Sequence, residues 1–293
     1  MTVRPVTEAD YDAIAAFLRE DEERLFGRPS RIEAADIGQW MSETDLERHS
    51  WLYEDDDGVF GVAWTWHEHD TGVAIGVVHE RMQGRGLGAE MVERSERLAR
   101  ERSATRMHQI AIGPDAAAAQ LLTSRGYRDV RRFYDMAIQL ERAPDVPDIP
   151  VDRFREEDAR PFHAAIDEAF QDHWEHHSRT FEDWWERQMR SPNFDTSLWF
   201  VVRDGDEIAA ATRNEANRNG GGYIGAIGVR RPWRGKGYAK ALLLHSFREF
   251  YERGISRVTL GVDAQNPTGA THLYERVGMH VEAENVVFEK PLP

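Results

Sequence analysis

The sequence predicts a mixed α/β (α+β) protein of two tandem domains, each a mixed, mostly antiparallel sheet flanked by helices. Three observations support this prediction. A strand, a glycine-containing turn and a long helix occur twice, at 72–92 and 222–243. Asp-Gly pairs at 57–58 and 204–205 stand between apolar runs and indicate β-hairpins. A segment rich in proline and charge, 141–150, separates the two copies.

Both halves are predicted to contain the same elements in the same order. Each begins with a short strand, at 3–5 and 151–154, followed by helices with acid-rich starts. The hairpin strands come next, and then the strand, glycine turn and long helix of the repeat. A further strand follows at 106–112 and 257–263, then a helix that ends in glycine and a closing pair of strands. One parallel βαβ crossover in an otherwise antiparallel meander accounts for this order.

The boundary between the domains is predicted at the proline-rich segment. Its prolines at 144, 147 and 150 cannot continue a helix or a central strand. We therefore expect an N-terminal domain at 1–143, a linker at 144–150 and a C-terminal domain at 151–293.

Composition narrows the functional class. The net charge of −15 argues against a nucleic-acid binder and against a polybasic membrane anchor. The absence of cysteine excludes disulfides, thiolate nucleophiles and zinc–thiolate sites. The first residues show no basic head followed by an apolar run, and no stretch has the length of a membrane span. We expect a cytoplasmic protein without nucleic-acid or membrane partners, and its oligomeric state stays open.

The stretch VRRPWRGKGYAKALLLHSF, 229–247, places two glycines among cations directly before an apolar helix. An apolar stripe fixes that helix, so its first free N–H groups face the preceding turn. Such a turn at a helix N-terminus favours a pyrophosphate. The positive charge would come from Arg230, Arg231, Arg234 and Lys236. The alternative is an ordinary glycine-rich connection with solvated arginines, and neither a Walker A nor a Rossmann pattern fits.

A second motif lies at 261–279. Asn266 precedes a proline, and Tyr274 lies on the apolar face of a helix that closes at Gly278. Taken alone, Asn266 is an N-cap and Tyr274 is a core aromatic residue. Together with the phosphate turn, the two residues resemble the Gcn5-related N-acetyltransferases (GNAT). The resemblance covers both halves, and the tandem arrangement with its aromatic segment 169–185 is similar to mycothiol synthase-like acetyltransferases.

The resemblance implies an N-acetyltransferase that uses acetyl-CoA as co-substrate, needs no metal and acts on a primary amine of a small molecule. It implies that the pantetheine arm pairs with the backbone near Ile227 and Val229 and contacts Asn266. It implies that Tyr274 protonates the CoA thiolate as general acid, and that an N–H near Ile227 or Gly228 stabilises the oxyanion. The pyrophosphate would bind the amides of Arg234, Gly235, Lys236, Gly237, Tyr238 and Ala239.

The C-terminal domain is expected to carry the chemistry. The first half keeps the phosphate turn Gln83–Gly88, but Leu122 stands in the place of Tyr274 and 112–120 contains no asparagine. Leucine cannot protonate a thiolate, so we expect a degenerate, non-catalytic N-terminal domain. Whether its turn binds acetyl-CoA stays open. The rival functions are a non-catalytic acyl-CoA-binding or scaffold protein and a protein or peptide N-acetyltransferase.

The general base also stays open. The resemblance implies a glutamate six residues before Val229, where this sequence has Tyr223, with Gly225 two residues further on. Glu215, on the preceding strand, is one candidate, and its alternative is a solvated hairpin residue. This departure weakens the assignment of a mycothiol precursor as the acceptor.

The segment DHWEHH, 172–177, allows two interpretations. His173 and His177 have the i, i+4 spacing of a metal pair, but no third ligand is evident and no metal is expected. In the family this region forms the acceptor wall, which makes His173, Trp174, Trp184 and Trp185 candidates for the pocket. The alternative is the packing of an amphipathic helix.

Overall fold

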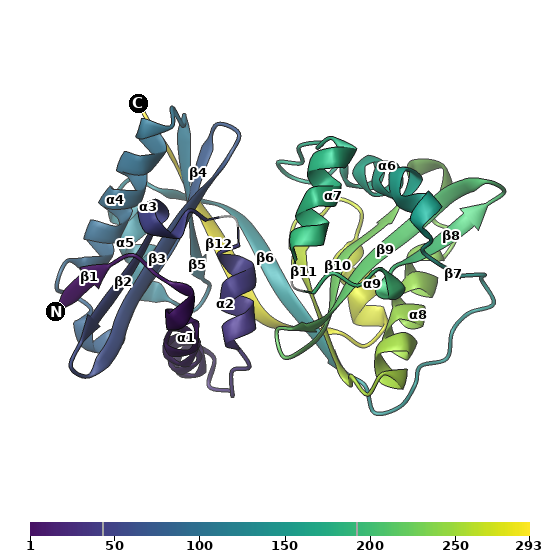
Figure 1. Cartoon of the computed structure of the whole chain (residues 1–293), viewed down its shortest axis with the longest axis horizontal. Coiled ribbons are helices and arrows are strands. Elements are labelled where there is room, and N and C mark those ends of the chain that lie inside the picture. Colours follow the sequence, from purple (N-terminus) through teal and green to yellow (C-terminus); the bar gives the residue numbers. More distant parts are fainter. Residues whose placement is uncertain (43, 192) are drawn as a thin grey trace. The chain divides into compact units, whose positions relative to one another are not determined.

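The computed structural model describes residues 1–42, 44–191 and 193–293. The chain divides into two compact units, which we call unit 1 (Met1–Phe133 with Ala283–Pro293) and unit 2 (Tyr134–Glu282). Each unit consists of a mixed sheet with helices (Figure 1), and the predicted fold class is therefore confirmed.

Unit 1 contains a sheet with the strand order β1-β2-β3-β4-β5-β12, in which only β4 and β5 are parallel. The Asp-Gly turn between β2 and β3 forms as predicted, with Gly58 at φ 103°. The helices and strands of this part of the chain are β1 (Thr2–Arg4), α1 (Tyr11–Phe26), α2 (Ala34–Trp40), α3 (Leu46–His49), β2 (Ser50–Asp55), β3 (Gly58–Glu68), β4 (Thr71–Val78), α4 (Leu87–Glu101), β5 (Arg106–Ile112) and α5 (Ala116–Ser124).

Unit 2 repeats this plan with the strand order β7-β8-β9-β10-β11-β6, and here β10 and β11 are the parallel pair. The second Asp-Gly turn joins β8 to β9. The elements are β7 (Asp152–Arg153), α6 (Ala159–Phe170), α7 (Phe181–Arg190), β8 (Phe200–Asp204), β9 (Glu207–Arg218), β10 (Gly221–Val229), α8 (Tyr238–Glu252), β11 (Arg257–Asp263) and α9 (Ala270–Arg276). Within the described ranges of the chain, no helix is long and apolar enough to cross a membrane.

Two long strands run from one unit into the other. Strand β6 (Arg128–Gln139) begins in unit 1, and its residues from Tyr134 onward belong to unit 2. Strand β12 (His280–Pro291) begins in unit 2 and returns to unit 1, where Asn285 to Pro291 pair antiparallel with β5. Each unit thus takes its last strand from the other half of the sequence. The predicted linker, 144–150, lies inside unit 2, where Arg248 donates to the Pro144 carbonyl at 2.7 and 3.0 Å.

The core of unit 2 explains why α8 is fixed so firmly. The apolar stripe predicted for this helix is buried: Leu242, Leu243, Phe247 and Phe250 have no exposed surface. Three of these residues pack with the inward face of β11 and with Tyr274 in one cluster. Gly222 allows this close approach, because a Cβ there would lie 2.8 Å from the Phe250 ring. The start of α8 is therefore held in place relative to β10 and β11.

Histidines that are buried or half-buried should make stability depend on pH. Burial lowers the pKa of His49, His67, His163, His173 and His245. In the unfolded chain these groups titrate near 6.5, so below that pH the unfolded chain binds more protons than the folded one. We expect the free energy of unfolding to fall between about pH 7.5 and about pH 5.5, which thermal melts would measure. His163→Phe should reduce this dependence, whereas His272→Asn, at an exposed position, should leave it unchanged. A melting temperature that rises toward pH 5.5 would contradict the expectation.

Candidate active site

The parallel strands of unit 2 separate early. β10 and β11 pair only at Gly222↔Val258 and Tyr223↔Thr259, whereas β10 continues alongside β9 to Val229. The register of β10 against β9 steps by one residue between Ile224 and Ala226, so Gly225 is the extra residue of a β-bulge. The backbone of β10 beyond Tyr223 is therefore not paired with β11, which leaves an edge to which an extended ligand could add.

The phosphate turn stands next to this opening. Gly235 and Gly237 have φ of +80° and +83°, and α8 begins directly after Gly237. No other atom lies within 4 Å of where a Cβ of Gly235 would stand, so the turn is open to a ligand. Left-handed glycines before a helix N-terminus turn successive N–H groups toward one point, a geometry that suits a pyrophosphate.

Acidic side chains engage most of the cations around the turn. Arg230 donates to Glu168 at 2.6 Å and to Glu207 at 2.8 Å. Arg231 and Arg234 both pair with Asp172, and these hydrogen bonds lower the pKa of that carboxyl to about 2. The remaining cation of the set is Lys236, which is exposed and makes no ion pair within the described ranges. Three of the four cations are thus ion-paired, while the Arg231 side chain stays 56% exposed to solvent.

Hydrogen bonds from the Arg234 side chain connect the end of β10 to the end of α6. Its Nε donates to the Val229 carbonyl at 3.2 Å, and its second terminal nitrogen donates to the Ala169 carbonyl at 3.3 Å. The two elements meet at Gly228, where a Cβ would lie 2.6 Å from the Cβ of Ala169. The Arg234 side chain thus holds the strand end, and its backbone N–H donates to the Arg231 carbonyl at 3.3 Å.

Asn266 does not cap a helix. Helix α9 begins at Ala270, after Gly269 in the left-handed conformation at φ +72°, so the N-cap interpretation is wrong. The Asn266 Oδ1 accepts hydrogen bonds from the backbone N–H and the hydroxyl of Thr268, at 2.8 and 2.6 Å. The Nδ2 group has no hydrogen-bond partner in the described part of the chain. It can therefore donate to a ligand carbonyl.

Tyr274 is both a core residue and a possible acid. Only 7% of its surface is exposed, and it packs in the main cluster of unit 2. Burial, together with the nearby Tyr223, raises the pKa of Tyr274, so its hydroxyl keeps its proton at neutral pH. No hydrogen bond of the described residues engages this hydroxyl. It lies close to Tyr223, the last paired residue of β10, and therefore at the point where the strands separate.

Glu215 is not a solvated hairpin residue, because only 4% of its surface is exposed. It accepts hydrogen bonds from Arg213 and, at 3.1 Å, from Arg218. Its carboxylate lies 3.0 Å from where a Cβ of Gly225 would stand, directly over the bulge. Sequence reasoning missed both arginines. The alternation of Arg213 and Glu215 along one strand was the available signal, since such residues share a face.

The aromatic segment of unit 2 packs as an amphipathic helix does. Trp184 and Trp185 contact Trp199, with ring centroids 5.8 and 6.1 Å apart, as the packing alternative predicts. His173 stacks on Phe170 with centroids 4.2 Å apart, close to the end of β10. Within the described ranges, neither His173 nor His177 belongs to a group of three or more side chains close enough to share a metal ion.

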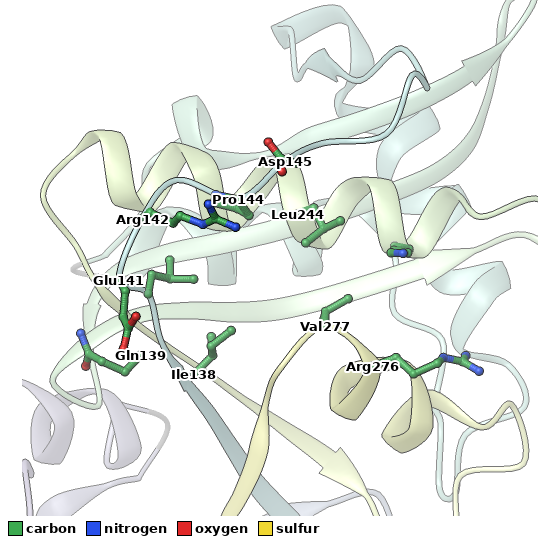
Figure 2. A pocket seen from close by; sticks show the side chains of 11 residues that line it. Ile138, Gln139, Glu141, Arg142, Pro144, Asp145, Leu244, Arg276 and Val277 are labelled. Carbon is green, nitrogen blue, oxygen red and sulfur yellow. The ribbon is translucent and has the colours of Figure 1, made fainter.

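A separate cleft of about 470 Å³ lies beside α8 and the end of α9 in unit 2. Figure 2 shows it between Leu244 on α8, Val277 after α9 and the chain segment 138–145. It contains none of the residues predicted to bind acetyl-CoA or to act in catalysis.

Unit 1 has the same glycine turn as unit 2 but differs in its strand pairing and at the position of Tyr274. Its turn has the same conformation, with Gly84 at φ 72° and Gly86 at φ 86°. Its parallel strands, however, stay paired up to Ile75↔Ile110, and Ile75 corresponds to Ala226 in the repeat. Leu122 is buried in the core in the place of Tyr274.

A parallel strand pair that opens beside a glycine-rich turn, with a protonated tyrosine nearby, is the arrangement expected of an acetyl-CoA-dependent N-acyltransferase. The sequence model of the acetyltransferase (GNAT) family matches residues 12–127 and 152–279. The chain belongs to this family, with one match in each unit.

Known proteins resemble the chain over both units. It is 27% identical over 255 residues to the mycothiol acetyltransferase of Nocardiopsis dassonvillei, which covers 76% of this chain and 75% of that protein. It is 29% identical over 192 residues to the mycothiol acetyltransferase of Propionibacterium freudenreichii subsp. shermanii. That match covers 62% of this chain and 61% of the relative, less than two thirds of its length. The crystal structure of a GCN5-related N-acetyltransferase from Sphaerobacter thermophilus has a TM-score of 0.86 at 31% identity, covering 99% of this chain and 95% of that one. The predicted likeness to mycothiol synthase-like tandem GNAT proteins is confirmed.

Proposed function

We propose that unit 2 transfers the acetyl group of acetyl-CoA to a primary amine of a small molecule. The observation that supports this most is the early separation of β10 from β11 beside the Gly235–Gly237 turn, with Tyr274 at the opening. Unit 1 has the turn but keeps its strands paired further and has Leu122 instead of a tyrosine. Its role in this proposal is structural.

The residues of unit 2 fit acetyl-CoA as follows. The backbone of Ile227 and Val229, on the unpaired side of β10, would hold the pantetheine arm as an added strand. The Nδ2 of Asn266 would donate to an amide carbonyl of that arm. The pyrophosphate would bind N–H groups from the open turn and the first turn of α8, which comprise Arg234, Gly235, Lys236, Gly237, Tyr238 and Ala239.

The chemistry needs one acid and one base. As the amine nitrogen forms its bond to the thioester carbonyl carbon and the carbon–sulfur bond breaks, Tyr274 would give its proton to the departing thiolate. A backbone N–H near Ile227 or Gly228 would donate to the carbonyl oxygen as it gains negative charge. The proton lost by the amine would pass to a carboxylate beside the bulge or through water to solvent. The two relatives described above favour a small acceptor, because both are mycothiol acetyltransferases.

The rival function is an acyl-CoA-binding protein without turnover. One observation favours it: Glu215, the carboxylate nearest to the bulge, already accepts hydrogen bonds from two arginines. The third candidate, acetylation of a peptide, is an outcome of the same experiment.

The test is an acetylation assay on the full chain. Acetyl-CoA would be mixed with a panel of small primary amines and of short peptides, with CoA thiol release and product mass measured. We expect acetylated small amines. Acetyl-CoA binding without any product would favour the rival, and product from peptides alone would favour a peptide acetyltransferase.

A further inference from the structure

The bulge of β10 is covered by a guanidinium. The terminal nitrogen Nη2 of Arg213 lies 2.8 Å from where a Cβ of Gly225 would stand. Only glycine leaves this place free, so the guanidinium lies directly over the backbone at which the strands begin to separate. Arg213 is thus next to the reacting centre of the proposed function.

Arg213 is held in place from one side only. In the described part of the chain its single hydrogen-bond partner is Glu215, through Nη1. Glu215 is in turn fixed by Arg218, whose guanidinium carbon lies 3.9 Å from the centre of the Tyr223 ring. A guanidinium carries five N–H donors in a planar fork, so Arg213 keeps donors for another acceptor group. Its side chain is 19% exposed, which leaves those donors within reach of a ligand.

The opposite side of Tyr223 carries negative charge. The Tyr223 hydroxyl lies 3.5 Å, and an Asp135 carboxylate oxygen 3.8 Å, from where a Cβ of Gly261 would stand. Tyr223 therefore separates a guanidinium at the bulge from a carboxylate over β11.

We propose that Arg213 binds a carboxylate of the acceptor, so that the acceptor is a small molecule carrying both a primary amine and a carboxylate. This inference rests on the proposed function and names its substrate class. The amine end lies toward Tyr274, and the carboxylate lies on the free edge of Arg213. A single negative charge fits this place better than a phosphate dianion, because Glu215 stands beside it and repels a second negative charge more strongly.

The first test needs no variant. The wild-type chain would be given matched pairs of acceptors, L-amino acids and their carboxamides, which share the amine and differ in the carboxylate. We expect kcat/KM to be about 10- to 100-fold higher for the acids, the range expected from a charge-assisted hydrogen bond.

The second test uses Arg213→Gln. We expect kcat/KM for the acids to fall about 10- to 100-fold, while the values for the carboxamides change less than about threefold. Arg253→Gln is the matched control, because Arg253 pairs with Glu249 and Asp195 at the far end of α8. It should leave both series within about twofold of wild type.

The outcomes separate this inference from the proposed function. Acetylation of carboxamides as fast as of acids, or an equal loss on both series in Arg213→Gln, would overturn the assignment of Arg213 and leave the acetyltransferase standing. Binding of acetyl-CoA without acetylation of any amine would overturn both.

Discussion

Replacing Tyr274 with phenylalanine is expected to lower kcat at least about 10²-fold while leaving the affinity for acetyl-CoA unchanged, because a general acid typically contributes 10² to 10⁴. The structure gives the reason. The ring packs in the core of unit 2, and phenylalanine fills the same space, so the substitution removes the hydroxyl alone. That hydroxyl has no hydrogen bond in the described ranges, so little folding energy should be lost with it.

The measurement is steady-state turnover alongside calorimetric titration with acetyl-CoA. Tyr251→Phe is a matched control, since it also removes one hydroxyl from unit 2, there one that donates to the Glu141 carbonyl at 3.2 Å. It should leave kcat unchanged. Tyr223→Phe tests whether the Tyr223 hydroxyl, and not that of Tyr274, is the general acid. If Tyr274→Phe kept wild-type turnover and Tyr223→Phe lost it, the general acid would be Tyr223.

The long helix and the turn before it could be predicted from sequence because their causes are local. The stripe of α8 repeats with helical spacing, and Gly235 and Gly237 mark left-handed positions that other residues avoid. The same reasoning predicted the two hairpins, which form at these places, with 56–57 and 205–206 as their loop residues.

The ion pairs of the site could not be predicted in this way. Arg231 and Arg234 are bound by Asp172, which stands about sixty residues earlier in the chain and reaches them only because α6 packs on Gly228. The phosphate turn therefore carries less free positive charge than its composition indicates. Arg213 was missed for a related reason, since its position over Gly225 depends on a bulge between two strands.

Asn266 shows how local competition shifts a helix start. An asparagine before a proline is a good N-cap signal, yet its side chain binds Thr268 instead, and Gly269 is the N-cap of the helix.

The exchange of β6 and β12 between the units could not be predicted from the sequence pattern. A closing strand pair can be predicted from alternation, but the pattern does not say which unit each strand joins.

Replacing Gly237 with valine is expected to weaken acetyl-CoA binding at least about 10²-fold, whereas the matched replacement Gly86→Val should leave it unchanged. Both glycines stand directly before a long helix with nearly the same φ, +83° and +86°. A branched side chain in this conformation should cost both units about the same, roughly 1–2 kcal/mol. Any difference in binding then reports which turn holds the ligand and not which unit is strained.

Calorimetric titration of the wild-type chain should give one site per chain. The reason lies in the strands, because a turn of the right conformation is not sufficient. In unit 1 the parallel strands stay paired up to Ile75, further along the repeat than in unit 2, so less of the β4 backbone is open toward β5. In unit 2 the backbone of β10 is open toward β11 beyond Tyr223. Thermal melts of both variants would verify equal destabilisation. Loss of binding in Gly86→Val, or two sites in the wild type, would mean that the turn alone suffices and that unit 1 also binds the co-substrate.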